Sequence, residues 1–396
     1  MNNTLYHGAA LTLRIVATSV LVFTCYFVIG LQLAVVPTFV HLRLGYNPLV
    51  AGLAISIQYV ATLLSRPAAG HMADRLGGKF TAFFGLVTLV ISSLVFIASA
   101  KALTHPAISL GALLVSRLFL GVGESCSATG STLWGIGRTG PEHTALVISW
   151  SGVASYGALA VGAPTGVWLV DELGPASVGI VGFVVIMLGL FWSLAMGPAP
   201  VSRGEGVSLG QVFTKVLPYG LSLALGGVGF GTIASFITLY YASMHWQQSA
   251  YALSAFSISF VATRLLFAKT IDRYGGYRVA IASLTVQTIG LVILWLAPNP
   301  ALALTGSAIS GFGFSLVFPA LGVEAVNRFP IHDRGSALGF YTAFIDLSLG
   351  ISGPVAGFIV VRSGYSGIFP FAAALSLIGF LIAFVLYRND LLCEGR

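Results

Sequence analysis

The sequence GHMADRLGGKF, Gly70 to Phe80, places one acid, two bases and three glycines in a region that is otherwise almost continuously apolar. A near copy, FAKTIDRYGGYR, runs from Phe267 to Arg278. Aligning the acids of the two copies brings five pairs into register: Arg66 with Arg264, Asp74 with Asp272, Arg75 with Arg273, Gly77 with Gly275, and Gly78 with Gly276. A charged turn that recurs half a chain later indicates an internal duplication.

The composition excludes an ordinary soluble protein. Of the 396 residues 57% are hydrophobic and only 8% are charged, and the mean hydropathy is +0.94. A soluble domain is about a quarter charged, so this chain cannot cover a water-facing surface. The net charge of +7 is interpreted as the Lys and Arg bias of cytoplasmic loops rather than as a nucleic-acid surface.

Apolar runs between charges, prolines and turn residues are long enough to cross about 30 Å of hydrocarbon as helices. A β-barrel would instead show alternating segments of about ten residues. The predicted fold is therefore an all-α polytopic membrane protein with twelve transmembrane helices. The spans are residues 13–40, 49–70, 80–100, 108–134, 145–170, 176–197, 217–243, 250–268, 279–297, 301–327, 335–361 and 366–387.

The duplication divides the chain into two pseudo-symmetric six-helix bundles, residues 1–197 and 217–396, joined by a cytoplasmic linker at 198–216. Fainter echoes support it: LGVGES (120–125) resembles SGFGFS (310–315), and GAPTG (162–166) resembles GPVAG (353–357). Units with an even number of spans repeat in one orientation, so the pseudo-symmetry axis is expected along the membrane normal.

Basic residues predict the orientation. With both termini in the cytoplasm, fifteen Lys and Arg fall on or beside cytoplasmic ends, and only Arg43, Lys101 and Arg362 fall outside. Cytoplasmic loops carry an excess of Lys and Arg, so we expect both termini in the cytoplasm.

The motifs resemble those of a known family. GHMADRLGGK resembles the loop motif of the major facilitator superfamily, and SRLFLGVGES, with Arg117 and Gly121, resembles its second motif in the fourth helix. GAPTG partly matches the Gly-Pro pattern of the drug/proton antiporter branch, with the proline displaced by one residue, and Gly78 stands where the family usually carries Arg. GSTLWGIG, SLVFPALGV and FIDLSLGISGP resemble the YhhS-type group, known as arabinose-efflux permeases.

The resemblance implies a monomeric carrier in the bacterial inner membrane that rocks about a midplane site and uses the proton gradient without a cofactor or metal. It also implies a cytoplasmic latch that holds the two halves together when the site faces outward. The alternative is that these charges only anchor the topology. The latch positions are Gly70, Asp74, Arg75, Gly77 and Lys79, with Asp272 and Arg273 in the second copy.

Three charged residues lie deep in predicted spans: Arg117, Glu124 and Asp346. Charges at this depth are costly and are functional candidates by default. Burial favours the neutral form of a carboxyl group, so Asp346 could load a proton on one side and release it on the other. The alternatives are a hydrogen-bonding brace for Arg117, a non-titrating partner of Arg117 for Glu124, and a packing hydrogen bond for Asp346.

The resemblance implies a central cavity lined by the first, fourth, seventh and tenth helices, with help from the second, fifth, eighth and eleventh. The polar and aromatic residues at mid-depth on these helices describe a cavity with aromatic faces and few hydrogen-bonding groups, although many of them could be packing. Such a cavity suits a small amphiphilic organic molecule. Gln58 and Tyr59 are adjacent and are expected to face different ways. The candidates are Tyr26, Gln32, Gln58, Tyr59, Ser127, Trp150, Tyr156, Thr232, Ser235, Phe256 and Phe314.

These features predict a secondary transporter that exports a small organic molecule, such as a drug, a sugar or a metallophore, against proton entry. A proton-coupled importer and a non-transporting receptor or scaffold are the alternatives. An intramembrane enzyme is not expected, because no His cluster or Ser-Lys pair lies at depth. A nucleotide-driven pump is not expected either, because the sequence has no phosphate-binding loop that ends in Gly-Lys-Ser or Gly-Lys-Thr.

Overall fold

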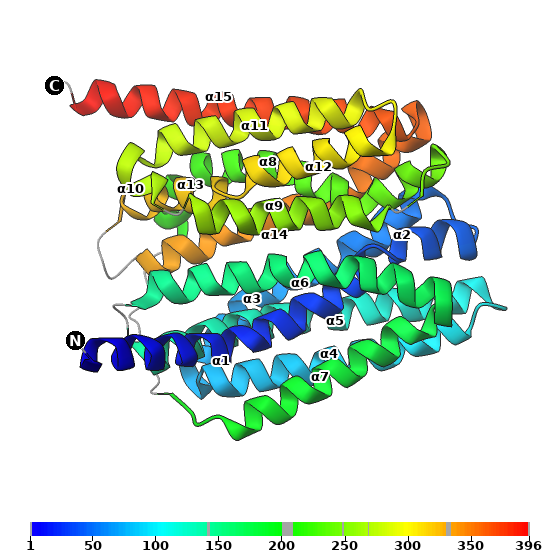
Figure 1. Cartoon of the computed structure of the whole chain (residues 1–396), viewed down its shortest axis with the longest axis horizontal. Coiled ribbons are helices and arrows are strands. Elements are labelled where there is room, and N and C mark those ends of the chain that lie inside the picture. The colour runs from blue at the N-terminus through cyan, green and yellow to red at the C-terminus, as the bar shows by residue number, and fades with distance from the viewer. Residues whose placement is uncertain are drawn as a thin grey trace. The chain divides into compact units, whose positions relative to one another are not determined.

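The computed structural model of the chain describes residues 2–140, 143–199, 209–247, 249–267, 269–329 and 334–394, and within these ranges it contains helices and no β-strand. Eleven helical spans in these ranges are long and apolar enough to cross a membrane, and Tyr251–Leu266 forms a shorter apolar helix. The predicted all-α fold with twelve spans is confirmed. The helices (Figure 1) are α1 (Asn2–Leu33), α2 (Val36–Thr38), α3 (Pro48–Leu76), α4 (Gly78–Lys101), α5 (Pro106–Thr139), α6 (Thr144–Leu173), α7 (Ala176–Ala195), α8 (Leu209–Ser243), α9 (Ala250–Leu266), α10 (Thr270–Tyr274), α11 (Gly276–Trp295), α12 (Pro300–Phe314), α13 (Val317–Val326), α14 (Arg334–Ser363) and α15 (Ile368–Glu394).

The chain divides into two compact units. Unit 1 comprises Met1–Gly45 and Ile57–Gly204, and unit 2 comprises Tyr46–Ser56 and Glu205–Arg396. α8 begins at Leu209, inside the predicted linker at 198–216. Residues 200–208 of that linker lie outside the described residues.

The repeated turn has the same backbone geometry in both copies. Gly77, between α3 and α4, has φ 89° and ψ 155°, and Gly275, between α10 and α11, has φ 82° and ψ 152°. A side chain is rarely tolerated at such positive φ values. The resemblance to a loop motif suggested that the rest of the first copy is a loop. It is helical instead, because α3 continues to Leu76.

The glycine after each turn is required by packing. A Cβ on Gly78 would lie 2.6 Å from the backbone nitrogen of Trp134 on α5, and a Cβ on Gly276 would lie 2.4 Å from the carbonyl oxygen of Ala320 on α13. The Arg that the family usually carries at position 78 therefore has no room here. Glycine lets the start of each helix touch a neighbouring helix backbone.

In unit 1, α4 lies against α5 and α7, and α1 lies against α6. Two reciprocal serine pairs join α4 to α5. The Ser92 hydroxyl donates to the carbonyl of Ser116 at 2.8 Å and the Ser116 hydroxyl donates back to the carbonyl of Ser92 at 2.8 Å. Ser99 and Ser109 repeat the arrangement at 2.8 and 2.9 Å. Lipid provides no hydrophobic driving force for helices to associate. These hydrogen bonds therefore help to hold α4 and α5 together in a fixed register.

The double variant Ser92→Ala and Ser116→Ala is expected to destabilise unit 1 modestly. Interhelical hydrogen bonds in membrane proteins are worth about 0.6 kcal/mol on average and about 1.7 at most. Thermal unfolding of the purified protein, compared with Thr285→Ala, measures the loss, since the Thr285 hydroxyl bonds only within its own helix, to the carbonyl of Ile281. Equal melting temperatures for the double variant and the wild type would contradict this role.

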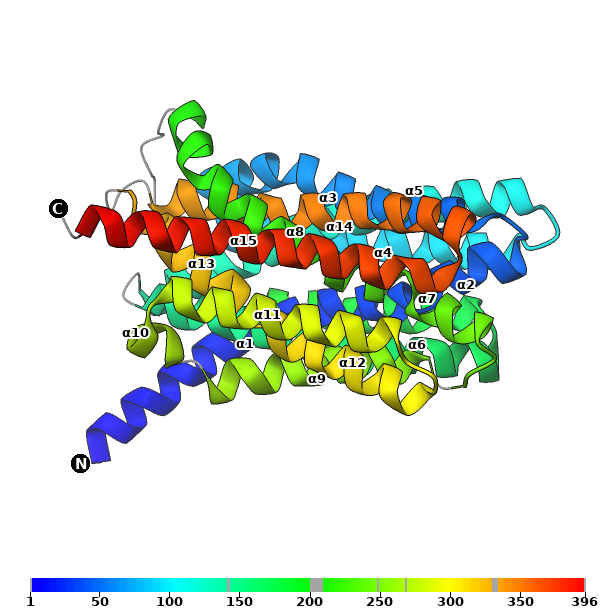
Figure 2. The same ribbon diagram turned by 90° about the horizontal axis from the view of Figure 1, so that it is seen from above.

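In unit 2, α11 lies between α15 and α12, and α8 packs on α14 and α15. Figure 2, turned by 90°, again shows α11 between α15 and α12. The amino-terminal turns of α3 belong to this unit and cross α14 at two glycines. A Cβ on Gly52 would lie 2.3 Å from the carbonyl oxygen of Gly353, and a Cβ on Gly353 would lie 2.5 Å from that of Gly52. Glycine at both positions allows the two backbones to touch.

Prolines interrupt the first and tenth spans. Pro37 has no N–H for the carbonyl of Leu33, where α1 ends, and the chain continues through α2 into a π-helical turn, η1 (Phe39–Arg43). Pro319 likewise leaves the carbonyl of Ser315 without its helical donor, and α12 ends one residue earlier. The Arg264 side chain replaces that donor, since its Nη2 lies 3.2 Å from the Ser315 oxygen.

Candidate functional site

A polar cluster in unit 1 surrounds Glu124 on α5. The Gln58 Nε2 donates to Oε2 of Glu124 at 2.8 Å, and the Thr62 hydroxyl lies 3.1 Å from the same oxygen. Gln58 and Thr62 are one turn apart on α3 and therefore face the same way. All three side chains are buried, with Glu124 only 3% exposed. The buried carboxyl thus accepts from the Gln58 amide and shares the single Thr62 hydroxyl proton with the carbonyl oxygens of Gln58, at 3.0 Å, and Gly121, at 3.2 Å.

Gly121 makes this contact possible. A Cβ on Gly121 would lie 2.2 Å from the carbonyl oxygen of Gln58, so α3 and α5 meet backbone to backbone at this point. The Thr62 hydroxyl also lies 3.2 Å from the Gly121 carbonyl. A side chain at 121 would push α3 away and lengthen both hydrogen bonds to Glu124.

Arg117 is the second charge of the cluster. It lies two turns before Glu124 on α5, is fully buried, and its Nη1 lies 3.4 Å from Oε1 of Gln32 on α1. Glu124 and Tyr59 lie within electrostatic range of its guanidinium. Gln32 stands directly before the end of α1 at Leu33. Arg117 thus connects the interrupted first span to the helix that carries Glu124.

Unit 2 carries aromatic rings at the matching positions. The register of the repeated turn aligns Gln58 with Phe256 and Thr62 with Phe260, and the LGVGES echo aligns Glu124 with Phe314. The packing agrees with this alignment. A Cβ on Gly311 would lie 2.1 Å from the carbonyl oxygen of Phe256, just as a Cβ on Gly121 would lie 2.2 Å from that of Gln58. One scaffold therefore holds a hydrogen-bonded carboxyl in unit 1 and stacked rings in unit 2.

The aromatic cluster is formed by Phe230 on α8, Phe256 and Phe260 on α9, and Phe314 on α12. The ring centroids of Phe230 and Phe256 are 5.0 Å apart, and those of Phe260 and Phe314 are 6.2 Å apart. The Arg264 guanidinium lies 5.0 Å from the Phe260 ring centroid. These distances are typical of stacked aromatic and cation–π contacts.

Asp346, the third predicted intramembrane charge, is 3% exposed on α14 of unit 2. Its neighbours on that helix pack against α8: Ile345 and Ser348 lie where a Cβ on Gly227 would meet them. Among the described residues, each unit therefore has one fully buried carboxyl group in a transmembrane helix, Glu124 in unit 1 and Asp346 in unit 2.

The predicted latch residues lie at the ends of helices within their own units. Asp74 and Arg75 are exposed at the end of α3, and Asp272 and Arg273 are exposed on α10. Lys79 is used inside unit 1, where its Nζ contacts the carbonyl oxygens of Leu194, at 3.5 Å, and of Met196 at the end of α7. A cation at the carboxyl end of a helix is favourable. Gly70 has nothing within 4 Å of a built Cβ.

Arg328 has the corresponding role in unit 2. Its Nη2 donates to the Tyr277 hydroxyl at 3.0 Å and forms an ion pair with Asp390 near the end of α15. The hydrogen bond to Tyr277, with the ion pair, raises the pKa of Arg328 above its ordinary value, although burial acts in the opposite direction. Both units thus fasten the last helix to its neighbours with a basic side chain.

The other predicted cavity residues fall into two groups. Tyr26, Trp150 and Tyr156 are half-buried, and Ser127, Thr232 and Ser235 are buried. Gln58 and Tyr59 are both buried, at 0% and 5% exposure, although adjacent residues were expected to face different ways. Tyr59 lies near Arg117, whereas Gln58 donates to Glu124.

Four residues of the two clusters were not predicted: Thr62, Phe230, Phe260 and Arg264. A signal for Thr62 was present, since it stands one helical turn after Gln58. Arg264 appeared only as the partner of Arg66 in the repeat, and its contact with the broken tenth span depends on Pro319, 55 residues away in sequence. Among the described residues no group of three His, Cys, Asp or Glu could hold a metal ion, and Cys25 and Cys126 are buried thiols.

Comparisons with known proteins give the family. The profile of the Major Facilitator Superfamily matches residues 18–254 and 219–391. An MFS-type transporter of Burkholderia mallei (strain SAVP1) is 50% identical over 386 residues, 98% of this chain and 95% of its own length. One from Pseudomonas aeruginosa (strain UCBPP-PA14) is 50% identical over 381 residues, 96% of this chain and 94% of its own.

Solved structures agree on the fold. The nucleoside transporter NupG superposes with a TM-score of 0.72 at 15% identity, covering 94% of this chain and 99% of its own. The human organic anion transporter MFSD10 (TETRAN) superposes with a TM-score of 0.67 at 14% identity, covering 93% and 98%. Because the family profile matches most of the chain and two relatives are 50% identical over nearly its full length, the chain belongs to the major facilitator superfamily and is a multi-pass membrane transporter of that type.

Proposed function

We propose that the protein is a proton-coupled exporter of a small amphiphilic organic molecule in the bacterial inner membrane, with both termini in the cytoplasm. The observation that carries the proposal is Glu124, a carboxyl buried in α5 and held by Gln58 and Thr62 from α3. The Gln58 amide, helped by the shared Thr62 hydroxyl, stabilises the carboxylate, and burial favours the protonated acid. A group balanced in this way can bind and release a proton when its surroundings change.

The contrast between the two units supports the amphiphilic substrate. Unit 1 offers an amide, a hydroxyl and an acid at Gln58, Thr62 and Glu124, the positions where unit 2 offers the packed phenyl rings of Phe256, Phe260 and Phe314. In a carrier whose substrate site lies between its two halves, such a pair suits a molecule with a polar end and an aromatic or aliphatic end. A bare ion would gain nothing from the aromatic half.

The interrupted first and tenth spans support alternating access. Broken helices near the middle of the membrane are typical of substrate and coupling-ion sites in transporters. Gln32 adjoins one break, and Arg264 donates to the Ser315 carbonyl at the other. We propose that these breaks bend as the two bundles rock, and that Asp74 and Arg75 act in the cytoplasmic latch.

Reconstitution tests the proposal. Purified protein in liposomes, loaded with a panel of amphiphilic cations, anions and sugars, is given a pH gradient of either sign. Export coupled to proton entry predicts solute movement against the proton flow, and a symporter would move solute with it. The transport proposal would be contradicted if no solute moved in response to the gradient and the lumen did not acidify. Binding-induced thermal stabilisation selects the panel beforehand.

A further inference from the structure

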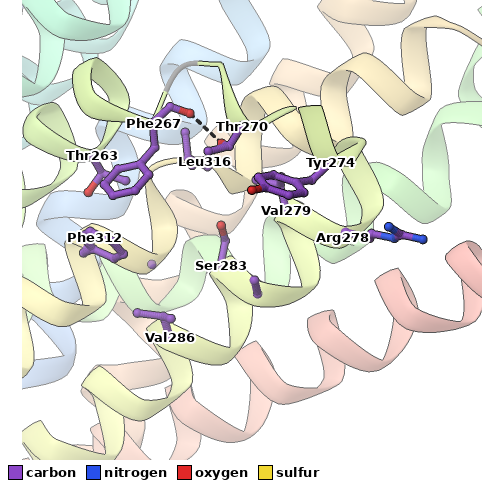
Figure 3. A pocket seen from close by; sticks show the side chains of 12 residues that line it. Thr263, Phe267, Thr270, Tyr274, Arg278, Val279, Ser283, Val286, Phe312 and Leu316 are labelled. Carbon is purple, nitrogen blue, oxygen red and sulfur yellow. Dashed lines mark hydrogen bonds between the residues drawn. The ribbon is translucent and has the colours of Figure 1, made fainter. Parts of the chain in front are cut away.

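A groove runs along unit 2 between α9, α11 and α12 and encloses about 330 Å³ (Figure 3). None of the residues that line it belongs to the aromatic cluster. The floor is α12, which packs against both α9 and α11, and these two helices form the walls. Residues that line it include Phe267, Val279, Ala282, Val286, Phe312 and Leu316.

The interior of the groove is apolar because its threonines bond to their own chain. The Thr263 hydroxyl donates to the carbonyl of Ser259 at 2.7 Å, and the Thr270 hydroxyl donates to that of Phe267 at 2.6 Å. The rings of Phe267 and Phe312 meet edge to face at 5.7 Å. Such walls suit an alkyl chain and offer little to a polar solute.

The mouth of the groove is basic. Thr270 and Tyr274 of α10 line it, and the Arg273 guanidinium lies 5.2 Å from the Tyr274 ring centroid. Lys269, directly before α10, and Arg273 are exposed, with Asp272 as the one acid between them in sequence. The aliphatic stem of Arg278 forms part of the wall, while its guanidinium points away from the groove (Figure 3), with Nε donating to the Tyr387 hydroxyl at 2.8 Å. An apolar slot that ends among cations matches the shape and charge of an anionic lipid.

We propose that this groove binds one anionic phospholipid, with part of an acyl chain between Ala282 and Phe312 and the phosphate beside Lys269 and Arg273. Basic side chains near a membrane surface attract anionic headgroups, and an exposed apolar groove between membrane spans needs an apolar occupant. The site would link the lipid to α10, the short helix inside the second copy of the repeated turn.

The test uses the full-length protein purified in detergent, with phosphatidylglycerol or phosphatidylcholine added. Native mass spectrometry is expected to show one retained phosphatidylglycerol, and the melting temperature is expected to rise more with phosphatidylglycerol than with phosphatidylcholine. Ala282→Trp, which fills the slot, is expected to abolish both effects. The matched control Thr285→Trp lies exposed on the same helix outside the groove and is expected to keep both.

A second pair of variants tests the headgroup and does not depend on the folding of Ala282→Trp. Lys269→Gln with Arg273→Gln is expected to remove the preference for phosphatidylglycerol, and Arg362→Gln, at the end of α14, is expected to preserve it. The proposal fails if Ala282→Trp retains the bound lipid, if both lipids stabilise equally, or if inorganic phosphate alone gives the same rise. It also fails if Ala282→Trp converts a dimer to a monomer in light scattering, because a second copy would then be the occupant.

Discussion

Replacing Glu124 by Gln is expected to reduce pH-driven transport to the level of empty liposomes. The amide keeps the size of the side chain and can still pair with Gln58 and Thr62, which now donate to Glu124 at 2.8 and 3.1 Å, but it cannot carry a proton. Substrate exchange without a pH gradient does not require proton release and is expected to continue. Transport assays with and without the gradient, on the same proteoliposomes, separate the two.

Two comparisons sharpen this result. Glu124→Asp keeps a titratable group and is expected to retain part of the pH-driven rate. Asp346→Asn is expected to abolish pH-driven transport while leaving the fold intact, if both buried carboxyls take part in coupling. Full pH-driven transport by Glu124→Gln would show that Glu124 only neutralises Arg117.

Replacing Gly121 by Ala is expected to lower the stability of the protein strongly. The added Cβ would lie 2.2 Å from the carbonyl oxygen of Gln58, and a backbone atom cannot move aside as a flexible side chain can. Overpacking of this kind costs about 1–3 kcal/mol, which for a unit of this size lowers Tm by roughly 2–4 °C per kcal/mol. The same shift would separate α3 from Glu124 and impair proton coupling.

Gly111→Ala is the matched control on the same helix. Nothing lies within 4 Å of a Cβ built at Gly111, and Ala is favoured over Gly inside a helix by roughly 0.5–1 kcal/mol, so its Tm is expected to stay the same or rise. Gly311→Ala, with its Cβ 2.1 Å from the Phe256 oxygen, is expected to behave like Gly121→Ala. A Gly121→Ala protein as stable as Gly111→Ala would contradict the close crossing of α3 and α5.

The sequence by itself determined the fold class and the duplication. Twelve apolar runs between charged turns leave few alternatives to transmembrane helices, since each unpaired backbone group in lipid is costly. The repeat of Asp-Arg with two glycines was enough to pair Gly77 with Gly275, and their φ values of 89° and 82° agree. The cost of burying charge identified Glu124 and Arg117 before any contact was known.

Tertiary structure alone decided which residues meet. Gln58 and Thr62 stand 66 and 62 positions from Glu124, and nothing in their local sequence indicates the helix that they approach. The same holds for Lys79, whose position in a charged turn indicated a latch but whose ammonium contacts the end of α7, 117 residues away at Met196. Local periodicity fixes which face of a helix is apolar, whereas close crossings at glycines depend on the packing of whole helices, and those crossings bring the donors to the buried carboxyl.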